Sequence, residues 1–184
     1  MATPLDFAKA LLNRLGLSQT KNRLVSLVAF AAQEGGHWAN GARYNPFNTS
    51  LSLPGSRAVI GQVQAYKDWP QGIEATARTI AQSNMRPILD ALKADADPKT
   101  FQHAVTSTPW CPQSIPGCTD YAARDPYALY SSWANKQDST AIATTGSPTN
   151  WPLILTSIAA LGAVSTAVFY YEKGRLPFMR RARA

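Results

Sequence analysis

Apolar positions near the start of the chain recur at the spacing of amphipathic helices. The first such pattern covers residues 4–15 and stops at Gly16, a residue that commonly ends a helix. A second pattern covers residues 20 to 33 or 34, with apolar side chains three and four positions apart. These side chains are Leu24, Leu27, Val28 and Ala31. Gly35 follows directly and supplies the backbone freedom that a left-handed helix cap requires.

The middle of the chain predicts a loop, a short β-hairpin and three further helices. Residues 37–57 are rich in Asn, Gly, Pro and Ser, which is typical of a loop. Residues 58–66 alternate loosely between apolar and polar side chains, which predicts a short hairpin or an irregular extended segment. Asp68, with Gln71 three positions later, resembles the capping box that begins a helix. Helical spacing then continues to residue 83 and returns over residues 86–95 and 98–107.

A stretch without any charged residue runs from Ser139 to Tyr171. Within it, "WPLILTSIAALGAVSTAVFYY" (151–171) is long enough to cross a bilayer, which needs about 20 apolar residues. Trp151 lies at one end of this segment and Tyr170 and Tyr171 at the other, as is typical of membrane interfaces. We therefore predict one transmembrane helix, with a buried core helix of weak polar face as the alternative.

The segments on either side of the predicted span differ in charge. Residues 172–184, "EKGRLPFMRRARA", carry five basic residues against one acidic residue, a net +4 of the chain's +7. A basic cluster beside a span is typical of a tail that contacts anionic lipid. Nucleic acid is the competing partner, but the basic residues before the span are scattered, so we predict no specific nucleic-acid binding. Residues 136–150 are rich in Ser, Thr, Ala and Gly, which predicts a linker.

The predicted organisation has four parts. Residues 1–135 form a mainly α domain with a small hairpin, and its last part, residues 107–135, is a Pro-rich aromatic segment that ends in a short helix. Residues 136–150 are a flexible linker, 151–171 a transmembrane helix and 172–184 a basic tail. The basic tail predicts that residues 1–150 lie on the outer side of a membrane, although "MATPLDFAKALLNRLG" lacks the apolar core of a signal peptide. A protein carried in a phage virion would satisfy both observations.

The two cysteines, Cys111 and Cys118, lie close together in "PWCPQSIPGC". The short spacing and the turn-forming residues between them suit a local disulfide, whose loop closure contributes roughly 2–3 kcal/mol. Two separate thiols in a reducing compartment are the alternative. The only histidines, His37 and His103, have a spacing that fits no usual zinc motif, so we predict no metal site.

Glu34 is the only acidic residue of the second predicted helix, and it lies at the C-terminal end. At 100° per residue it is about 20° from Leu27 and about 60° from Ala31 around the axis, so it borders the apolar stripe. Burial and the negative end of the helix dipole both raise the pKa of its carboxyl group. A carboxylic acid that is protonated near neutral pH suits general acid catalysis, whereas a solvated surface glutamate is the alternative.

The loop that follows, "HWANGARYNPFNT", is dense in aromatic and amide side chains. They are Trp38, Tyr44, Phe47, Asn40, Asn45 and Asn48. Aromatic faces stack on sugar rings, and amides hydrogen-bond to hydroxyl and acetamido groups, so this composition favours a carbohydrate site. The alternative is a loop that packs its own aromatic side chains over the core.

The order of these motifs resembles that of lysozyme-like peptidoglycan-cleaving domains of phage proteins, over roughly residues 5 to 110. More distantly, it is similar to flagellar and autolysin N-acetylglucosaminidases. Those enzymes show Glu-Ser-Gly at a helix end, an Asn-Asn-Leu-Phe-Gly loop, and a Phe-x-x-Tyr strand before a helix. The matching pieces here are Glu34-Gly35-Gly36, Asn45-Pro46-Phe47-Asn48-Thr49 and Val63-Gln64-Ala65-Tyr66.

The resemblance implies roles for individual residues. Glu34 matches the general acid that protonates the glycosidic oxygen, and Tyr66 matches an aromatic residue that faces the cleft. Asn45 and Asn48 match the loop that lines the sugar site. The candidate substrate-binding residues are Tyr44, Asn45, Phe47, Asn48 and Tyr66.

Two departures from the family pattern bear on mechanism. Gly35 replaces the serine of Glu-Ser-Gly, and no second carboxylate stands out. Asp68 is predicted to cap a helix and Glu74 to lie on a helix surface, while Asp120 and Asp125 fall in the Pro-rich segment. Glycosidases with two carboxylates place them on both sides of the bond. A single acid suits a lytic transglycosylase, or a substrate-assisted cleavage that uses the N-acetyl group.

We therefore expect a single-pass membrane protein of a phage virion, located in the virion membrane or in the host cell envelope. It would cleave the glycan strands of peptidoglycan, with Glu34 as acid and base. Its domain would face the peptidoglycan, and its other partners would be a lipid membrane, through residues 151–171 and the tail, and other virion proteins. We expect no cofactor. A catalytically inactive wall-binding or structural virion module is the alternative, and a pore-forming membrane protein is a third possibility that a single span with a long soluble domain disfavours.

Overall fold

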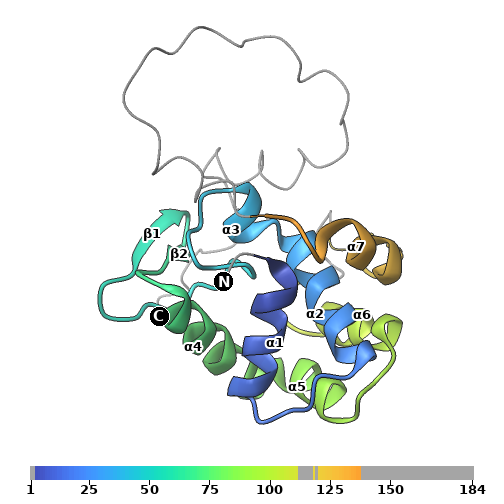
Figure 1. Cartoon of the computed structure of the whole chain (residues 1–184). Coiled ribbons are helices and arrows are strands. Elements are labelled where there is room, and N and C mark those ends of the chain that lie inside the picture. The colour runs from blue at the N-terminus through green and yellow to red at the C-terminus, as the bar shows by residue number, and fades with distance from the viewer. Residues whose placement is uncertain (1–2, 112–117, 119, 138–184) are drawn as a thin grey trace, which may run out of the picture. The chain divides into compact units, whose positions relative to one another are not determined.

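The computed structural model describes residues 3–111, 118 and 120–137. In this part of the chain it shows a mainly α fold with seven α-helices, one 3₁₀ turn and a two-stranded antiparallel hairpin (Figure 1). All of these elements belong to the first of the two units into which the chain divides, Met1–Thr145. The predicted class of a mainly α domain with a small hairpin is therefore confirmed for the described residues.

The first two helices begin at side-chain caps and end close to their predicted limits. Helix α1 (Pro4–Arg14) starts with a capping box, in which Thr3 accepts a hydrogen bond from the Asp6 N–H at 3.1 Å while the Asp6 carboxylate accepts one from the Thr3 N–H at 3.2 Å. Helix α2 (Lys21–Glu34) starts at Thr20, whose hydroxyl caps its first turn. A side-chain cap of this kind contributes about 1 kcal/mol.

The four later α-helices all carry a proline in their first turn, where the missing N–H costs nothing. They are α4 (Trp69–Ile80), α5 (Arg86–Lys93), α6 (Pro98–Thr106) and α7 (Pro126–Trp133). Asp68 caps α4 as predicted, accepting a hydrogen bond from the Gln71 N–H at 2.9 Å. The box is incomplete, because the Gln71 side chain binds the N–H of Lys67 and not that of Asp68.

The hairpin consists of β1 (Arg57–Ile60) and β2 (Val63–Ala65), paired antiparallel with Arg57 opposite Ala65. Gly61 makes the turn with a φ of 55°, a value that favours glycine. The prediction of a short hairpin over residues 58–66 is therefore confirmed. In Figure 1 the hairpin lies beside α4, on the side of the domain away from α7.

Two short elements were not predicted. Helix α3 (Gly36–Ala39) makes a single turn within a segment that the sequence assigns to a loop, and the 3₁₀ turn η1 (Ser83–Met85) follows α4. Both are too short to show the periodicity from which a helix is recognised.

Helix α2 is the centre of the core. It packs against α1, α6 and α7, which surround it in Figure 1. Phe30 on α2 is buried, and its ring centroid lies 4.3 Å from that of Phe47 and 5.9 Å from that of Phe101. Burying one such side chain contributes about 1.5–3 kcal/mol, so this aromatic group fixes how the loop and α6 lie against α2.

The first turn of α2 is tied to the last turn of α5 by a buried arginine. Arg23 donates hydrogen bonds to the carbonyl oxygens of Leu92 at 2.7 Å and Lys93 at 3.1 Å. The last carbonyl groups of a helix lack partners within the helix, so the guanidinium group satisfies two of them. The fixed start of α2 in turn determines where its other end lies.

Within the described residues, no helix is long and apolar enough to cross a membrane. The predicted span over residues 151–171, the basic tail over 172–184 and all of the linker after residue 137 lie outside the described residues. These three parts of the organisation therefore stay predictions.

The loop of residues 42–49 lies directly against two glycines. A Cβ atom on Gly36 would lie 2.1 Å from the carbonyl oxygen of Asn45, and one on Gly72 would lie 1.8 Å from that of Tyr44. Gly36 and Gly72 are thus required for the close approach of the chain's own loop to α3 and α4. The sequence analysis had not identified this role.

We predict that Gly72→Ala destabilises the domain by about 2 kcal/mol or more, because the added methyl group overlaps the loop carbonyl. A loss of stability is diagnostic, since alanine in place of glycine inside a helix ordinarily stabilises a protein by about 1 kcal/mol. Chemical denaturation measures the change. Gly41→Ala gives the reference for backbone strain without overlap: its added Cβ meets no atom within 4 Å, and its φ of 76° alone costs about 1–2 kcal/mol, a strain that Gly72 does not carry. A Gly72→Ala variant as stable as the wild type would show that the loop is free to move away.

Candidate active site

Glu34 is the last residue of α2, and the chain turns sharply after it. Gly35 adopts a left-handed conformation with a φ of 64°, and its N–H donates a hydrogen bond to the carbonyl oxygen of Ala31 at 3.0 Å. Gly35 is therefore the left-handed cap that the sequence predicted. Phe30 lies one turn before Glu34 on the same face of α2, so the Glu34 side chain is next to the buried aromatic group around Phe30.

Asn48 holds the end of α2 from the loop side. Its side-chain amide donates a hydrogen bond of 2.6 Å to the backbone carbonyl oxygen of Glu34, and the same amide lowers the pKa of the Glu34 carboxyl group. The Asn48 side-chain oxygen accepts a hydrogen bond from Asn40 at 2.9 Å, which fixes the orientation of the amide. Asn48 has a φ of 53°, a left-handed conformation that asparagine tolerates better than most residues. The structure thus brings Glu34 and Asn48 together.

Two aromatic residues complete the surroundings of the carboxyl group. The Trp110 side chain lies near enough to Glu34 to lower its pKa through hydrogen bonding, and the Trp110 ring packs edge-on against Phe30 with a centroid distance of 5.0 Å. Tyr121 also packs edge-on against Phe30, at 6.0 Å. Its buried hydroxyl group has no hydrogen-bond partner among the described residues. Burial, and next the charge of Glu34, raise the pKa of Tyr121 well above its ordinary value.

Burial raises the pKa of Glu34 from 4.5 to about 8, while the hydrogen bonds from Asn48 and Trp110 act in the opposite direction. Glu34 as a whole residue keeps part of its surface exposed, but its carboxyl group is closely surrounded by protein, and these surroundings determine its pKa. The carboxyl group is therefore mainly protonated at neutral pH and can donate a proton to a bound molecule. The sequence also predicted that the pKa of Glu34 is raised.

The other candidate carboxylates of the sequence do not flank Glu34. Glu74 binds Arg14 and Arg78, each at 2.6 Å, and these ion pairs lower its pKa. Asp68 caps α4, and both acids line an open surface depression together with Lys67. Asp125 caps α7, and Asp120 is exposed. None of the groups that shift the pKa of Glu34 is a carboxylate.

Asn45 and Phe47 lie in the interior, which changes the role expected for them. Neither has any exposed surface (0%). The Asn45 amide donates hydrogen bonds to the carbonyl oxygens of Thr49 at 2.9 Å and Gln64 at 2.7 Å, and its oxygen accepts one from the Thr49 N–H at 2.9 Å. With its amide fully engaged, Asn45 supports the loop and does not present itself to a substrate. Phe47 fills the core beside Phe30.

Tyr44 and Tyr66 are also held by their own neighbours. The Tyr44 ring is partly exposed and stacks on His37 at a centroid distance of 5.5 Å, while the Tyr44 N–H donates to His37 Nδ1 at 2.8 Å. Tyr66 is only 4% exposed, and its hydroxyl group bonds to Thr49 at 2.6 Å and to the Leu51 carbonyl oxygen at 2.9 Å. Burial raises the pKa of Tyr66. Tyr66 thus anchors the loop behind Asn48.

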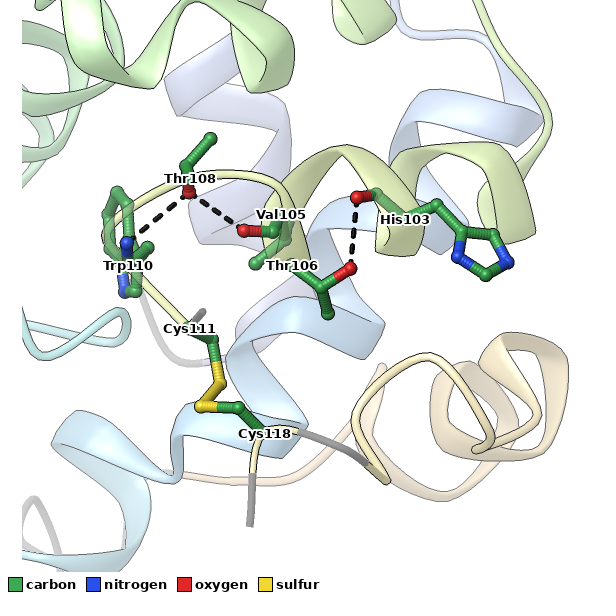
Figure 2. Close-up of a disulfide and its surroundings, with 7 residues drawn as sticks. All are labelled: His103, Val105, Thr106, Thr108, Trp110, Cys111 and Cys118. Atoms are coloured by element: carbon green, nitrogen blue, oxygen red, sulfur yellow. Dashed lines mark hydrogen bonds between the residues drawn. A yellow bond between two sulfur atoms is a disulfide. The ribbon is translucent and has the colours of Figure 1, made fainter. Parts of the chain in front are cut away.

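Cys111 and Cys118 form a disulfide, as the local-bridge interpretation predicted (Figure 2). Trp110 immediately precedes Cys111, so the bridge lies next to the site. Among the described residues there is no group of three or more His, Cys, Asp or Glu side chains that could hold a metal ion.

The sequence analysis did not identify Trp110 and Tyr121 as members of the site. They lie far from Glu34 along the chain, in a segment without helical or strand periodicity, and only the fold brings them to Phe30. The one local signal was the pair of cysteines between them, which the sequence analysis treated as a separate feature.

Comparison with family models, with curated proteins and with solved structures finds no match for this chain. We therefore infer the function of the chain from the residues around Glu34.

We predict that the raised pKa of Glu34 makes the domain less stable as pH rises. Between about pH 4.5 and 8 the unfolded chain has lost the Glu34 proton and the folded chain retains it, so stability declines across this window. Relative to Glu34→Gln, which stays neutral, the wild type should lose on the order of a few kcal/mol of unfolding free energy between pH 5 and 8. Denaturation curves at several pH values measure the difference. Parallel pH dependences for the two proteins would contradict the raised pKa.

Proposed function

We propose that the chain is a lysozyme-like enzyme that cleaves the glycan strands of bacterial peptidoglycan, with Glu34 as general acid and base. The observation that carries the proposal is an enclosed carboxyl group with a pKa of about 8, on a residue that keeps part of its surface exposed. An ordinary glutamate is ionised at neutral pH and has no proton to give, whereas Glu34 retains its proton there.

The reaction begins when Glu34 donates its proton to the glycosidic oxygen. The bond from the anomeric carbon to that oxygen breaks, the leaving sugar keeps the proton, and positive charge develops on the ring that remains. The Glu34 carboxylate then removes a proton from the 6-hydroxyl group of the same muramic acid residue. That oxygen attacks the anomeric carbon and closes a 1,6-anhydro ring, so the acid is regenerated and no water is consumed.

The absence of a second carboxylate beside Glu34 among the described residues favours this single-acid route. A hydrolytic alternative would use the N-acetyl group of the substrate as the internal nucleophile and water in the second step. Asn48 and Trp110 suit either reaction, because both bond to Glu34 and both keep part of their surface exposed. They would orient the carboxyl group, and after proton transfer they would stabilise its negative charge.

The setting of the reaction follows from the sequence beyond residue 137. A span over residues 151–171 and a basic tail over 172–184 would anchor the enzyme to a membrane, with its domain facing the peptidoglycan. We propose a phage virion protein that opens the wall locally when the genome passes into the host, beside other virion proteins.

An inactive wall-binding or structural virion module is the second candidate. The observations that favour it are Gly35 in place of the family's serine and the lack of a partner carboxylate among the described residues. A pore-forming protein would act on membranes and not on the wall.

We predict that the purified full-length chain clears a suspension of peptidoglycan and that Glu34→Gln lowers the rate by about a hundredfold or more, because the amide has no transferable proton. Glu74→Gln is the matched control, since it removes a partly exposed carboxylate that pairs with Arg14 and Arg78. Mass spectrometry of the products separates 1,6-anhydromuramic ends from reducing ends.

Equal clearing by the wild type and Glu34→Gln would remove Glu34 from the mechanism. Binding to the wall without clearing by any of the three proteins would support the inactive module. Leakage from lipid vesicles without any clearing would favour the pore-forming protein.

We further predict that the activity persists to unusually high pH for an acid-catalysed cleavage. With the Glu34 pKa near 8, kcat/KM should stay level through neutral pH and fall about tenfold per pH unit above 8. A decline that begins near pH 5 would show that Glu34 titrates as an ordinary glutamate when substrate binds.

A further inference from the structure

Two chain segments that are distant in sequence meet at the end of α2. Trp110 lies after α6 and Tyr121 lies before α7, and both rings pack edge-on against Phe30, at 5.0 Å and 6.0 Å between centroids. The Trp110 side chain also acts on the pKa of Glu34 as a hydrogen-bonding group, and Glu34 acts electrostatically on Tyr121. Both segments therefore lie beside the Glu34 carboxyl group.

The disulfide connects the Trp110 segment to the Tyr121 segment. Cys111 follows Trp110 directly, and the Tyr121 N–H donates a hydrogen bond of 3.1 Å to the carbonyl oxygen of Cys118. Figure 2 shows Trp110 and Cys111 in the segment that leaves α6, with Cys118 across the bridge.

On its other side, the backbone of Trp110 is held by α6. The Trp110 N–H donates to the hydroxyl of Thr108 at 3.3 Å, and that hydroxyl donates to the Val105 carbonyl oxygen at 2.7 Å (Figure 2). The backbone of Trp110 is thus held from two directions, by the end of α6 and by the bridge.

We propose that Trp110 is a positioning residue for Glu34 and that the Cys111–Cys118 disulfide sets its placement, so that the site is assembled only in the oxidised chain. Without the bridge, the cross-link between the two segments is lost, and the contact that they share among the described residues is the packing of both rings on Phe30. The consequence for activity rests on the proposed function. The effect on the surroundings of Glu34 does not.

Formation of the Cys111–Cys118 disulfide is a two-electron oxidation, and its reduction takes up two electrons. Oxidation joins the Cys111 and Cys118 sulfur atoms, releases two protons and passes two electrons to a thiol–disulfide oxidoreductase in its disulfide form. In reverse, a thiolate of a dithiol reductant attacks one sulfur, and the resulting mixed disulfide is resolved by the second thiol. The chain regains two thiols and the reductant ends as a disulfide. A chain in a reducing compartment would therefore hold a loosened site, and exposure to an oxidising environment would assemble it.

Titration of the Glu34 carboxyl group by ¹³C NMR tests the proposal without relying on enzyme activity. The chain has only three glutamates, Glu34, Glu74 and Glu172, so selective labelling gives one signal for each. Tyr121 does not interfere, because burial and the charge of Glu34 raise its pKa well above the ordinary value. The samples are the full-length oxidised chain, the same chain reduced with dithiothreitol, and the Cys111→Ser/Cys118→Ser variant.

We expect the pKa of Glu34 to be about 8 in the oxidised chain and to fall toward 4.5 in the reduced and double-serine proteins. Burial is the main cause of the raised pKa, and a displaced indole admits water to the carboxyl group. Glu74 should titrate alike in all samples, because its ion pairs with Arg14 and Arg78 lie elsewhere. A pKa of Glu34 that is the same in the folded reduced chain as in the oxidised chain would overturn the proposal.

If the reduced chain unfolds, a second variant tests whether Trp110 sets the surroundings of Glu34. Trp110→Ala in the oxidised chain keeps the bridge and removes the indole, and we expect it to lower the pKa of Glu34 as well. Trp133→Ala is the matched control, since it removes an equal ring from α7, where Lys136 lies 3.8 Å from the ring centroid. A pKa that stays near 8 in Trp110→Ala would limit the disulfide to general stabilisation of the fold.

Peptidoglycan clearing on the same samples separates this proposal from the enzyme assignment. If both hold, the reduced chain at pH 7 should clear about ten- to a hundredfold more slowly, because the acid is misplaced and ionised. A pKa that responds to reduction in a chain that clears no peptidoglycan would leave the positioning role intact and reject the proposed function.

Discussion

The hydrogen bond from the Asn48 amide to the backbone carbonyl of Glu34 is the contact on which the candidate site depends. The last carbonyl groups of a helix have no partners within it, so some other group has to satisfy them. Here that group comes from a loop whose path is fixed by Asn45, Tyr66 and the two glycines beneath it. With Arg23 anchoring its first turn, α2 is held at both ends, and Phe30 and Glu34 occupy fixed positions.

The same arrangement explains how the Glu34 carboxyl group can be enclosed and still donate its proton. Phe30, Trp110 and Tyr121 provide the low-polarity surroundings that keep the proton on Glu34. Asn48 and Trp110 contribute hydrogen-bond donors that limit the shift and are ready to stabilise the charge that forms after transfer. A fully apolar pocket would hold the proton more tightly but would leave the carboxylate product without partners.

The longer helices, the hairpin and the raised pKa of Glu34 could be predicted from the sequence because each depends on local information. Apolar spacing, the aspartate caps and Gly35 specify elements within a few residues of themselves. The interior positions of Asn45 and Phe47 could not be predicted, since an Asn-rich, aromatic loop has the same composition whether it faces a ligand or packs on the core. Trp110 and Tyr121 were missed because their meeting at Phe30 is a property of the tertiary fold.

The way the 42–49 loop meets the hairpin also bears on the solubility of the chain. A strand at the edge of a sheet exposes unpaired backbone groups that can pair with another molecule. On β2, the Gln64 N–H donates to the Thr49 carbonyl oxygen at 3.1 Å, and the Gln64 carbonyl oxygen accepts from Asn45. The Tyr66 N–H donates to the Arg43 carbonyl oxygen at 2.9 Å. A folded loop thus occupies this edge as a neighbouring strand would, and it denies a second copy of the protein a place to add its own strand.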